Sequence, residues 1–520
     1  MKRRLFIETF GCQMNVLDSE LVLSQLRAHG YESVDSRDAA DIVIYNTCSV
    51  REHAEQKVWS RLGELRAVKQ EKPHLVVAVI GCMAEREGKG IFQRYPHIDI
   101  LCGPAELDKL PGMVHNAVIA SSERLASEQL VLRRSDGGEP PGAACVAPRY
   151  PGPRRQVALM GNTSRRSGTL VAAQDTLELL DLSRSISPAD DVSRAYVRIT
   201  RGCNKFCTYC VVPYTRGPEV HRPPQNIIDE VRKLVDAGAR EVTLLGQTVN
   251  HYAYRHPDGR TTTFADLLYR VHENAPDLPR LRFVTSFPRD FTDAALQAMR
   301  DCPRICRYLH VPAQSGSDRI LRMMNRGYAA GEYRDFIGRA REMMSDISIA
   351  SDFIVGFPTE SEEDHLASLE LIRHCAFKNS FIFKYSPRPG TIAMDRYEDD
   401  VPEDVKRRRN SQMLAVQQEV SERLNREMIG RTVEVIAEGE SKLVSRQGRG
   451  DASLTELTVA GKSASSATRT TQLVGRTRGD QVVCFDGDAS LKGRIIHVRI
   501  VDAQALTLFG RAVDVPPASR

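Results

Sequence analysis

Three cysteines lie close together in the stretch CNKFCTYC, at Cys203, Cys207 and Cys210. Structural zinc sites and ordinary iron–sulfur clusters take four protein ligands, one more than this stretch supplies. Zinc knuckles and ribbons carry a second cysteine pair downstream, and no pair stands here at ribbon spacing. Three thiolates on one loop instead fit three corners of a [4Fe–4S] cluster and leave the fourth iron open. The alternative is that the three cysteines form a zinc site or that their spacing is a coincidence.

A second set of three cysteines is spread over the first part of the chain, at Cys12, Cys48 and Cys82. Each ends an apolar, β-branched run (RLFIETFGC, DIVIYNTC and LVVAVIGC) and is followed by a helix-like stretch. Alternating strands and helices predict a parallel sheet, whose ligands lie at the carboxyl ends of its strands. We therefore expect the three thiols to converge and to hold a second cluster with an open iron. The alternative is three buried cysteines at strand ends.

The elements that position these residues predict an α/β fold class with several domains. Residues 1–120 are expected to form the parallel α/β domain, and 121–190, rich in Pro, Gly and Arg, a partly disordered linker. Repeated strand–helix units in 191–422 predict a full or partial (β/α) barrel with the CNKFCTYC loop at its catalytic end. Short glycine-broken strands in 423–514 predict a small all-β barrel, interrupted by a loop insertion near 445–472.

Bulk properties narrow the class of protein. The 520 residues carry a net charge of +5, which permits a nucleic-acid partner without requiring one. The 12 cysteines are too sparse for a secreted disulfide scaffold. No apolar run approaches the roughly 18 residues of a membrane helix, and the N-terminus lacks a signal-peptide core. We expect a cytoplasmic protein that does not enter a membrane.

The motifs together resemble a known family. The CNKFCTYC loop is similar to that of the radical S-adenosylmethionine enzymes. ETFGCQMNVLDSE, YNTCSVREHAEQKV and VIGCMAER resemble the N-terminal domain of the methylthiotransferases, and LLGQTVNHY, HVPAQSGSDRILRMMNRGY and DFIVGFPTESEED resemble their radical domain. LVGRTRGDQVVCFDG resembles the TRAM domain, a small RNA-binding barrel. TFGCQMN and CNKFCTYCVVPYTRG are most like the MiaB-type branch.

The resemblance implies an activity and its cofactors. A MiaB-type enzyme adds a 2-methylthio group to N6-isopentenyladenosine next to the anticodon of tRNA, with two S-adenosylmethionine molecules and two [4Fe–4S] clusters. Cys12, Cys48 and Cys82 would hold the auxiliary cluster, and the Cys203 triplet the radical cluster. A first S-adenosylmethionine would methylate a cluster-bound sulfur and a second would yield the radical. Other branches act on threonylcarbamoyl-adenosine in tRNA or on a ribosomal-protein aspartate.

Several further residues are weaker candidates. Arg216 and Asp352 are possible catalytic-site residues, Arg216 through contact with substrate phosphate or a sulfur species. Four residues at the catalytic end of the barrel are candidates for contact with S-adenosylmethionine: Gln247, Asn250, Ser315 and Gly316. A basic run on a helix is a candidate for the tRNA backbone: Lys406, Arg407, Arg408 and Arg409. For each, a solvated or structural role is the alternative.

The partners expected are tRNA, a reducing electron donor and a sulfur source. We expect the protein itself to be a monomer. A rival of another class is a non-catalytic, metal-stabilised RNA-binding protein. Such a protein would bind zinc tightly and would show no visible absorbance, whereas two [4Fe–4S] clusters bring about eight irons per chain.

Overall fold

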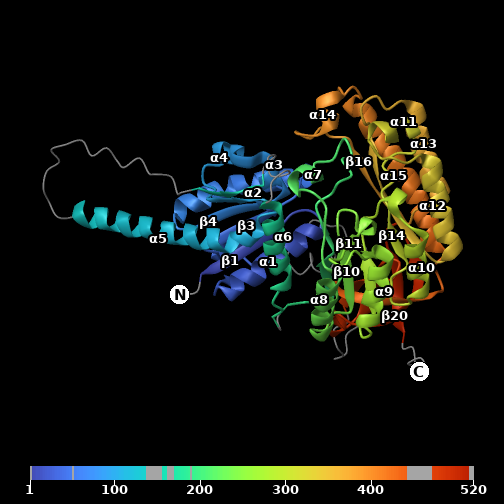
Figure 1. Ribbon diagram of the computed structural model, residues 1–520, viewed down its shortest axis with the longest axis horizontal. Coiled ribbons are helices and arrows are strands. Elements are labelled where there is room, and N and C mark those ends of the chain that lie inside the picture. Colours follow the sequence, from blue (N-terminus) through green and yellow to red (C-terminus); the bar gives the residue numbers. More distant parts are fainter. Residues whose placement is uncertain are drawn as a thin grey trace, which may run out of the picture. The chain divides into compact units, whose positions relative to one another are not determined.

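The computed structural model describes residues 3–49, 52–135, 155–160, 169–187, 190–441 and 471–513. The chain divides into two compact units, each built from separated stretches of sequence (Figure 1). The first unit comprises residues 1–188, 198–222 and 386–396, and the second comprises residues 189–197, 223–385 and 397–520. No helix among the described residues is long and apolar enough to cross a membrane.

The first unit is built on a parallel six-stranded sheet in the order β2-β1-β3-β4-β5-β6. Every residue of β3 and β4 is buried, as a sheet covered on both faces requires. The strands are β1 Arg4–Thr9, β2 Glu32–Ser33, β3 Ile42–Thr47, β4 Val76–Gly81, β5 Ile100–Cys102 and β6 Gln156–Ala158. The helices are α1 Gln13–Ala28, α2 Glu52–Glu71, α3 Cys82–Glu87, α4 Ile91–Arg94, α5 Leu110–Ser135 and α6 Thr169–Leu182. The parallel α/β domain expected here is confirmed.

The segment 121–190, expected to be a linker, contains regular structure. Helix α5 continues to Ser135, β6 pairs in parallel with β5, and α6 follows. Residues 136–154 and 161–168 lie outside the described residues. Composition alone could not reveal β6, because a strand of three residues is too short to show a period.

The remaining stretches of the first unit return from later in the chain. Residues 198–222 contribute β8 Thr200–Arg201, α7 Val212–Thr215 and β9 Val220–His221, and residues 386–396 contribute α14 Ile392–Arg396. The CNKFCTYC loop thus groups with the N-terminal sheet in the structure, and the domain bounds of 191–422 that we expected around it stay a prediction. The buried ion pairs described below are the physical reason.

The second unit begins with a partial (β/α) barrel made of two three-stranded sheets, in the orders β13-β10-β7 and β14-β15-β16. Two backbone hydrogen bonds join them: Cys306 N donates to Leu281 O at 2.8 Å, and Ser286 N donates to His310 O at 3.0 Å. The strands are β7 Arg194–Arg198, β10 Glu241–Leu245, β13 Arg280–Phe283, β14 Tyr308–His310, β15 Ser348–Val355 and β16 Asn379–Lys384. A short hairpin, β11 Ala253–Arg255 and β12 Thr261–Thr263, follows β10. The partial barrel expected from the sequence is confirmed.

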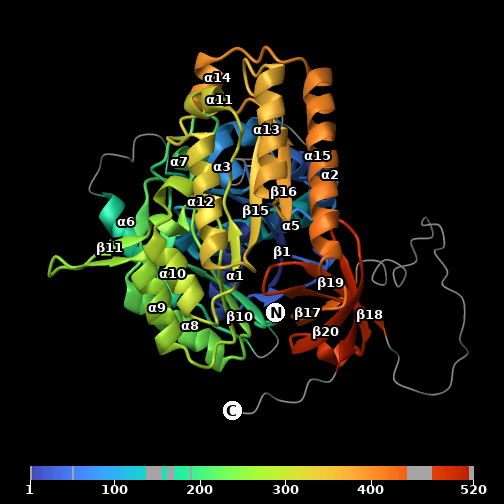
Figure 2. The same cartoon turned by 90° about the vertical axis from the view of Figure 1, so that its right-hand side faces the viewer.

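Helices cover one face of these strands. Helices α12, α13 and α15 lie side by side over β15 and β16 (Figure 2). Their amphipathic patterns explain the packing: Tyr333 and Phe336 of α12 and Leu369 of α13 are buried. The helices of this part are α8 Pro224–Asp236, α9 Phe264–Asn274, α10 Asp293–Asp301, α11 Asp318–Met323, α12 Ala330–Met343, α13 Glu362–Cys375 and α15 Glu403–Arg426.

The second unit ends in a closed five-stranded barrel in the order β17-β18-β19-β21-β20. Its strands are β17 Thr432–Glu440, β18 Thr471–Thr477, β19 Val482–Gly487, β20 Ile495–Ala503 and β21 Leu508–Val513. Val435, Leu473, Phe485 and Val498 form its core. The small barrel is therefore confirmed, and almost all of the expected insertion near 445–472 lies outside the described residues.

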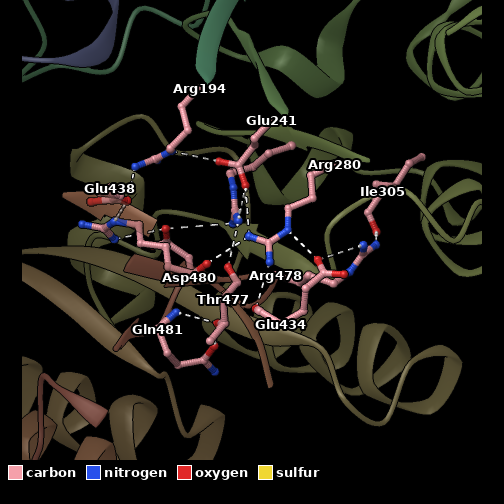
Figure 3. A network of polar contacts seen from close by, with 12 residues as sticks. Arg194, Glu241, Arg280, Ile305, Glu434, Glu438, Thr477, Arg478, Asp480 and Gln481 are labelled. Atoms are coloured by element: carbon pink, nitrogen blue, oxygen red, sulfur yellow. Dashed lines mark hydrogen bonds and ion pairs between the residues drawn. The ribbon is translucent and has the colours of Figure 1, made fainter. Parts of the chain in front are cut away.

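Buried charges attach the small barrel to the partial barrel (Figure 3). Arg280 is fully buried; its Nε donates to Glu434 Oε1 at 2.8 Å, and its Nη atoms donate to the carbonyls of Arg476 and Glu434. Arg282 donates to Glu241 Oε2 at 3.0 Å and to Thr477 O at 3.1 Å. We call the whole set the small-barrel network: Arg194, Glu241, Arg280, Arg282, Glu434, Glu438, Arg476 and Asp480.

Candidate metal centres: two cysteine triplets in one unit

The first cysteine triplet lies at the carboxyl ends of three adjacent parallel strands. Cys12 lies shortly after the end of β1 and directly before α1, Cys48 follows β3, and Cys82 begins α3 after β4. Gly11 has φ +127°, and a Cβ there would lie 2.3 Å from the Cβ of Cys48. Only glycine permits this close approach of the two strand ends. The structure thus brings together the thiols whose convergence the strand pattern predicts.

Electrostatics around this triplet favour a thiolate at Cys12. A hydrogen bond from Cys48 lowers the pKa of the Cys12 thiol to about 6; burial opposes the shift, and the charge of Arg216 adds to it. Burial raises the pKa of Cys82, and the charge of Arg216 opposes that rise. Because the thiolate is the form that binds metal, a cation beside the triplet suits a ligand set.

The second triplet lies on a tight loop. Gly202 has φ +64°, and a Cβ there would lie 2.0 Å from the carbonyl oxygen of Pro218, so glycine is required before Cys203. Cys203 N donates to Gly217 O at 3.1 Å, and Cys210 N donates to Cys207 O at 3.0 Å. Thr208 O accepts from Ala393 N of α14 at 2.8 Å, so the returning segment 386–396 holds the loop. Cys203 and Cys207 are buried, and Cys210 is half-buried.

A buried set of ion pairs ties this loop to the N-terminal sheet. Arg198 donates to Asp18 at 3.0 Å and to Asp181 at 2.9 Å, and all three side chains are buried. The positive neighbours hold the pKa of Asp181 far below its usual range despite burial, which acts in the opposite direction. We call the whole set the cysteine-side network: Asp18, Glu178, Asp181, Arg198, Arg201, Arg216 and Arg222.

Arg216 lies beside the first triplet. It follows Cys210 in the chain, and its Nη2 donates to Asp18 Oδ2 at 3.0 Å, with Asn15 Oδ1 at 3.5 Å. The Cys12 and Cys82 thiols both interact with its charge. Arg216 is buried, so this structure places it against the first triplet and not on a surface open to substrate phosphate.

The residues present fit an iron–sulfur cluster at each triplet. Each set offers three thiols on or beside tight backbone turns, the donors that such clusters use. The neighbouring Cys102, at the end of β5, directs its thiol to the carbonyls of Gly103 and Glu106, so it is engaged elsewhere. A cluster held by three thiols would leave one iron for a non-protein ligand.

The candidates for S-adenosylmethionine have structural contacts of their own. The Asn250 amide exchanges two hydrogen bonds of 2.8 Å with the backbone of Phe287, which joins the loops after β10 and β13. Gly316 N donates to Ser368 Oγ of α13 at 2.8 Å, and Ser315 Oγ lies 3.4 Å from the same hydroxyl. Gln247 is half-buried after β10. Their contact with S-adenosylmethionine stays a prediction.

The basic run on α15 is not a continuous RNA-facing patch, which corrects our prediction for two of its members. Lys406 and Arg409 are buried; Lys406 pairs with Asp399, and Arg409 donates to Glu360 at 2.9 Å. Residues three apart share one helix face, and here that face is turned inward. Arg407 and Arg408 are exposed. Arg407 lies beside Glu403, and Arg408 lies beside Glu362.

Asp352 lies on β15 and pairs with His310 of β14, with 3.1 Å between Oδ1 and Nε2. Burial lowers the pKa of His310, but the Asp352 carboxylate more than offsets this, so the pKa is raised. Sequence reasoning missed His310, although it stands in the motif HVPAQSGS. It also missed Asp18 and Asp181, because their pairing with Arg198 joins residues far apart in the sequence and leaves no local pattern.

Comparisons with known proteins agree with this architecture. Three family models match: "Uncharacterized protein family UPF0004" over residues 4–103, "Radical SAM superfamily" over 197–372 and "TRAM domain" over 453–513. A tRNA-2-methylthio-N(6)-dimethylallyladenosine synthase of Rhodopirellula baltica is 41% identical, over 100% of this chain and 97% of its own length. The enzyme of that name from Bacteroides thetaiotaomicron is 38% identical over 98% of this chain and 96% of its own length.

The chain belongs to this family of radical S-adenosylmethionine methylthiotransferases. The first matched region falls on the N-terminal sheet, the second on the CNKFCTYC loop and most of the partial barrel, and the described part of the third on β18 to β21 of the small barrel. Among solved structures, the radical S-adenosylmethionine methyltransferase TsrM of Kitasatospora setae is 14% identical with a TM-score of 0.46, and the match covers 76% of this chain and 77% of that one.

Proposed function

We propose that this enzyme adds a 2-methylthio group to N6-isopentenyladenosine next to the anticodon of tRNA. The proposal rests on one observation above all: two cysteine triplets belong to one compact unit, and among the residues that the structure describes neither triplet includes a fourth thiol. A methylthio transfer needs one open iron for S-adenosylmethionine and a second to hold sulfur. Relatives that share the full length of the chain bear the name of this activity.

The chain's own residues prepare the two centres. Cys12, Cys48 and Cys82 would hold one cluster, and Cys203, Cys207 and Cys210 the other. Arg216 offsets the negative charge of the first thiolate set, and Asp18 fixes the guanidinium in place. When bound, the clusters and S-adenosylmethionine supply the radical and the methyl and sulfur transfer. An electron donor and a sulfur source act as partners of a cytoplasmic monomer in this proposal.

Iron content tests the two centres separately. We expect about eight irons per chain in the anaerobically reconstituted protein, and about four after C12A/C48A/C82A or after C203A/C207A/C210A. The matched control is C302A/C375A, which removes two buried cysteines outside both triplets and should leave the iron content unchanged. Wild-type iron content in either triplet variant, or tight zinc in its place, would contradict the two-cluster assignment.

The substrate is tested with defined tRNA. The reconstituted enzyme, S-adenosylmethionine, a reductant and sulfide are incubated with tRNA bearing isopentenyladenosine or threonylcarbamoyl-adenosine. Nucleoside mass spectrometry should find the 2-methylthio product only with the first tRNA. A product only with the second tRNA, or only on a ribosomal-protein aspartate, would assign the chain to another branch of the same chemistry.

A further inference from the structure

One face of the sheet β14-β15-β16 is turned away from the helices that cover the other. Alternation places Ser351 and Phe353 on the covered face, where Ser351 Oγ lies 3.4 Å from Tyr333 Oη of α12. The register pairs Asp352 with Phe381 and Ile354 with Phe383, so these four side chains share the opposite face. In a partial barrel whose helices lie outside, that opposite face is the inner one.

Two aromatic rings are exposed on this inner face. Phe381 is 43% exposed and Phe383 is 39% exposed, although both belong to a strand of the central sheet. Ile354, the register neighbour of Phe383, is half-buried. Large apolar side chains left accessible together on a sheet mark a surface that another molecule covers.

A polar pair borders the aromatic rings. His310 and Asp352 form their ion pair on the same face, and the His310 ring meets the Phe381 ring edge-on, with centroids 6.2 Å apart. Both polar side chains remain partly accessible. The face therefore combines an aromatic surface, an aliphatic contact and hydrogen-bonding groups within a few residues, all on strands of the catalytic barrel.

This combination matches a purine base with an apolar substituent. Aromatic side chains stack on unpaired bases, and enzymes that modify a base take it out of the stack to reach it. A branched hydrocarbon on N6 would lie well against Phe383 and Ile354. The carboxylate of a threonylcarbamoyl group would be desolvated against these apolar side chains, at considerable cost.

We propose that the inner face of β15 and β16 binds the target adenine: Phe381 stacks on the base, Phe383 and Ile354 contact its apolar N6 substituent, and His310–Asp352 bonds its polar edge. Phe383 and Ile354 are then specificity-determining residues. This inference rests on the proposed function, because it takes an isopentenyl-bearing adenosine in tRNA as the ligand.

Binding measurements test the inference without turnover. Reconstituted enzyme with S-adenosylmethionine, kept without reductant, is titrated with anticodon stem-loop RNAs carrying isopentenyladenosine or plain adenosine. Wild type should prefer the isopentenylated RNA. Phe383→Ala should reduce that preference about tenfold, the size expected when an apolar pocket loses its contact with a small hydrocarbon. Phe381→Ala should weaken both RNAs alike, and Phe381→Trp should restore their binding.

The control is Leu366→Ala, which removes a 54% exposed apolar side chain from α13 of the same unit. It should leave both affinities unchanged. If wild type prefers the isopentenylated RNA and Phe383→Ala keeps the full preference, the inference is wrong and the proposed function stands. If wild type binds both RNAs equally, the proposed substrate fails and the inference fails with it.

Discussion

The two buried arginine networks use the same residue types to different ends. In the small-barrel network, Arg280 and Arg282 direct Nη donors to main-chain carbonyls of Glu434, Arg476 and Thr477. These guanidinium donors bind the backbone carbonyls of β17 and β18. In the cysteine-side network, Arg216 bonds the Asp18 carboxylate, and its charge acts on the thiols of the first triplet.

We propose that this difference separates a structural arginine from a functional one. Burial and ion pairing are common to both networks, so neither property decides. The decisive feature is what a guanidinium faces besides its carboxylate. A backbone carbonyl indicates a fixed joint between elements, whereas a set of thiolates indicates a place where bound charge is balanced.

The largest effect is expected for Asp18→Asn. Asp18 is fully buried and pairs with both Arg198 and Arg216, so neutralising it leaves two cations undercompensated. We expect the protein to lose about 3–5 kcal/mol of unfolding free energy and the first triplet to lose its iron. Denaturant unfolding and iron analysis measure the two losses. Asp258→Asn, which breaks a fully exposed pair with Arg260, is the control and should change neither quantity.

Arg280→Met should destabilise the small barrel by about 3 kcal/mol, because Glu434 and two carbonyls lose a buried donor. Hydrogen exchange should quicken in β17 and β18 while iron content stays at the wild-type value. Arg300→Ala, at an exposed pair with Asp301, is the comparison variant. Iron loss in Arg280→Met as large as in Asp18→Asn would remove the distinction between the networks.

Arg216→Lys keeps the positive charge but replaces the planar donor fork with a single ammonium. We expect product formation to fall about 10–100-fold, with weaker retention of iron at the first triplet and little change in stability. Arg222→Lys is the matched variant, because Arg222 belongs to the same network but pairs with Glu178. Equal iron retention in the two variants would argue against a special role for Arg216.

The smallest effect concerns Asp480, whose Oδ2 lies 3.1 Å from Lys378 Nζ. Burial opposes the shift, but Lys378, Arg476 and Arg282 lower the pKa of this carboxyl to about 2. The stabilisation is therefore present above the unfolded pKa near 3.8 and is lost as the pH falls toward 2. Asp480→Asn should cost about 2 kcal/mol at neutral pH. Unfolding of cluster-free protein should show a constant difference from pH 5 to 7, below the Lys378 pKa of about 8, that shrinks below pH 4. A difference that persists unchanged at pH 3 would contradict this prediction.

The elements were largely predictable from sequence because each has a local signal. The runs before Cys12, Cys48 and Cys82 are continuous and apolar, as buried parallel strands must be, and this also predicted where the thiols meet. The grouping of the CNKFCTYC loop with the first unit was not predictable. It depends on ion pairs such as Arg198–Asp18 between residues 180 positions apart. Lys406 and Arg409 are buried because they lie three residues apart on the inward face of α15. In the sequence, a run of four adjacent basic residues does not show which of them face inward.

The first unit is discontinuous along the chain, and this bears on how the protein is made. Its last stretch holds α14, whose Ala393 bonds to the cysteine loop, and Arg388, which pairs with Glu55 of α2 at 2.9 Å. A ribosome releases the chain from the N-terminus, so domains ordinarily close in the order of synthesis. Here the N-terminal sheet can form early, but the unit stays open until residue 396 emerges. We therefore expect iron and sulfur to be delivered to the finished site late in its biogenesis.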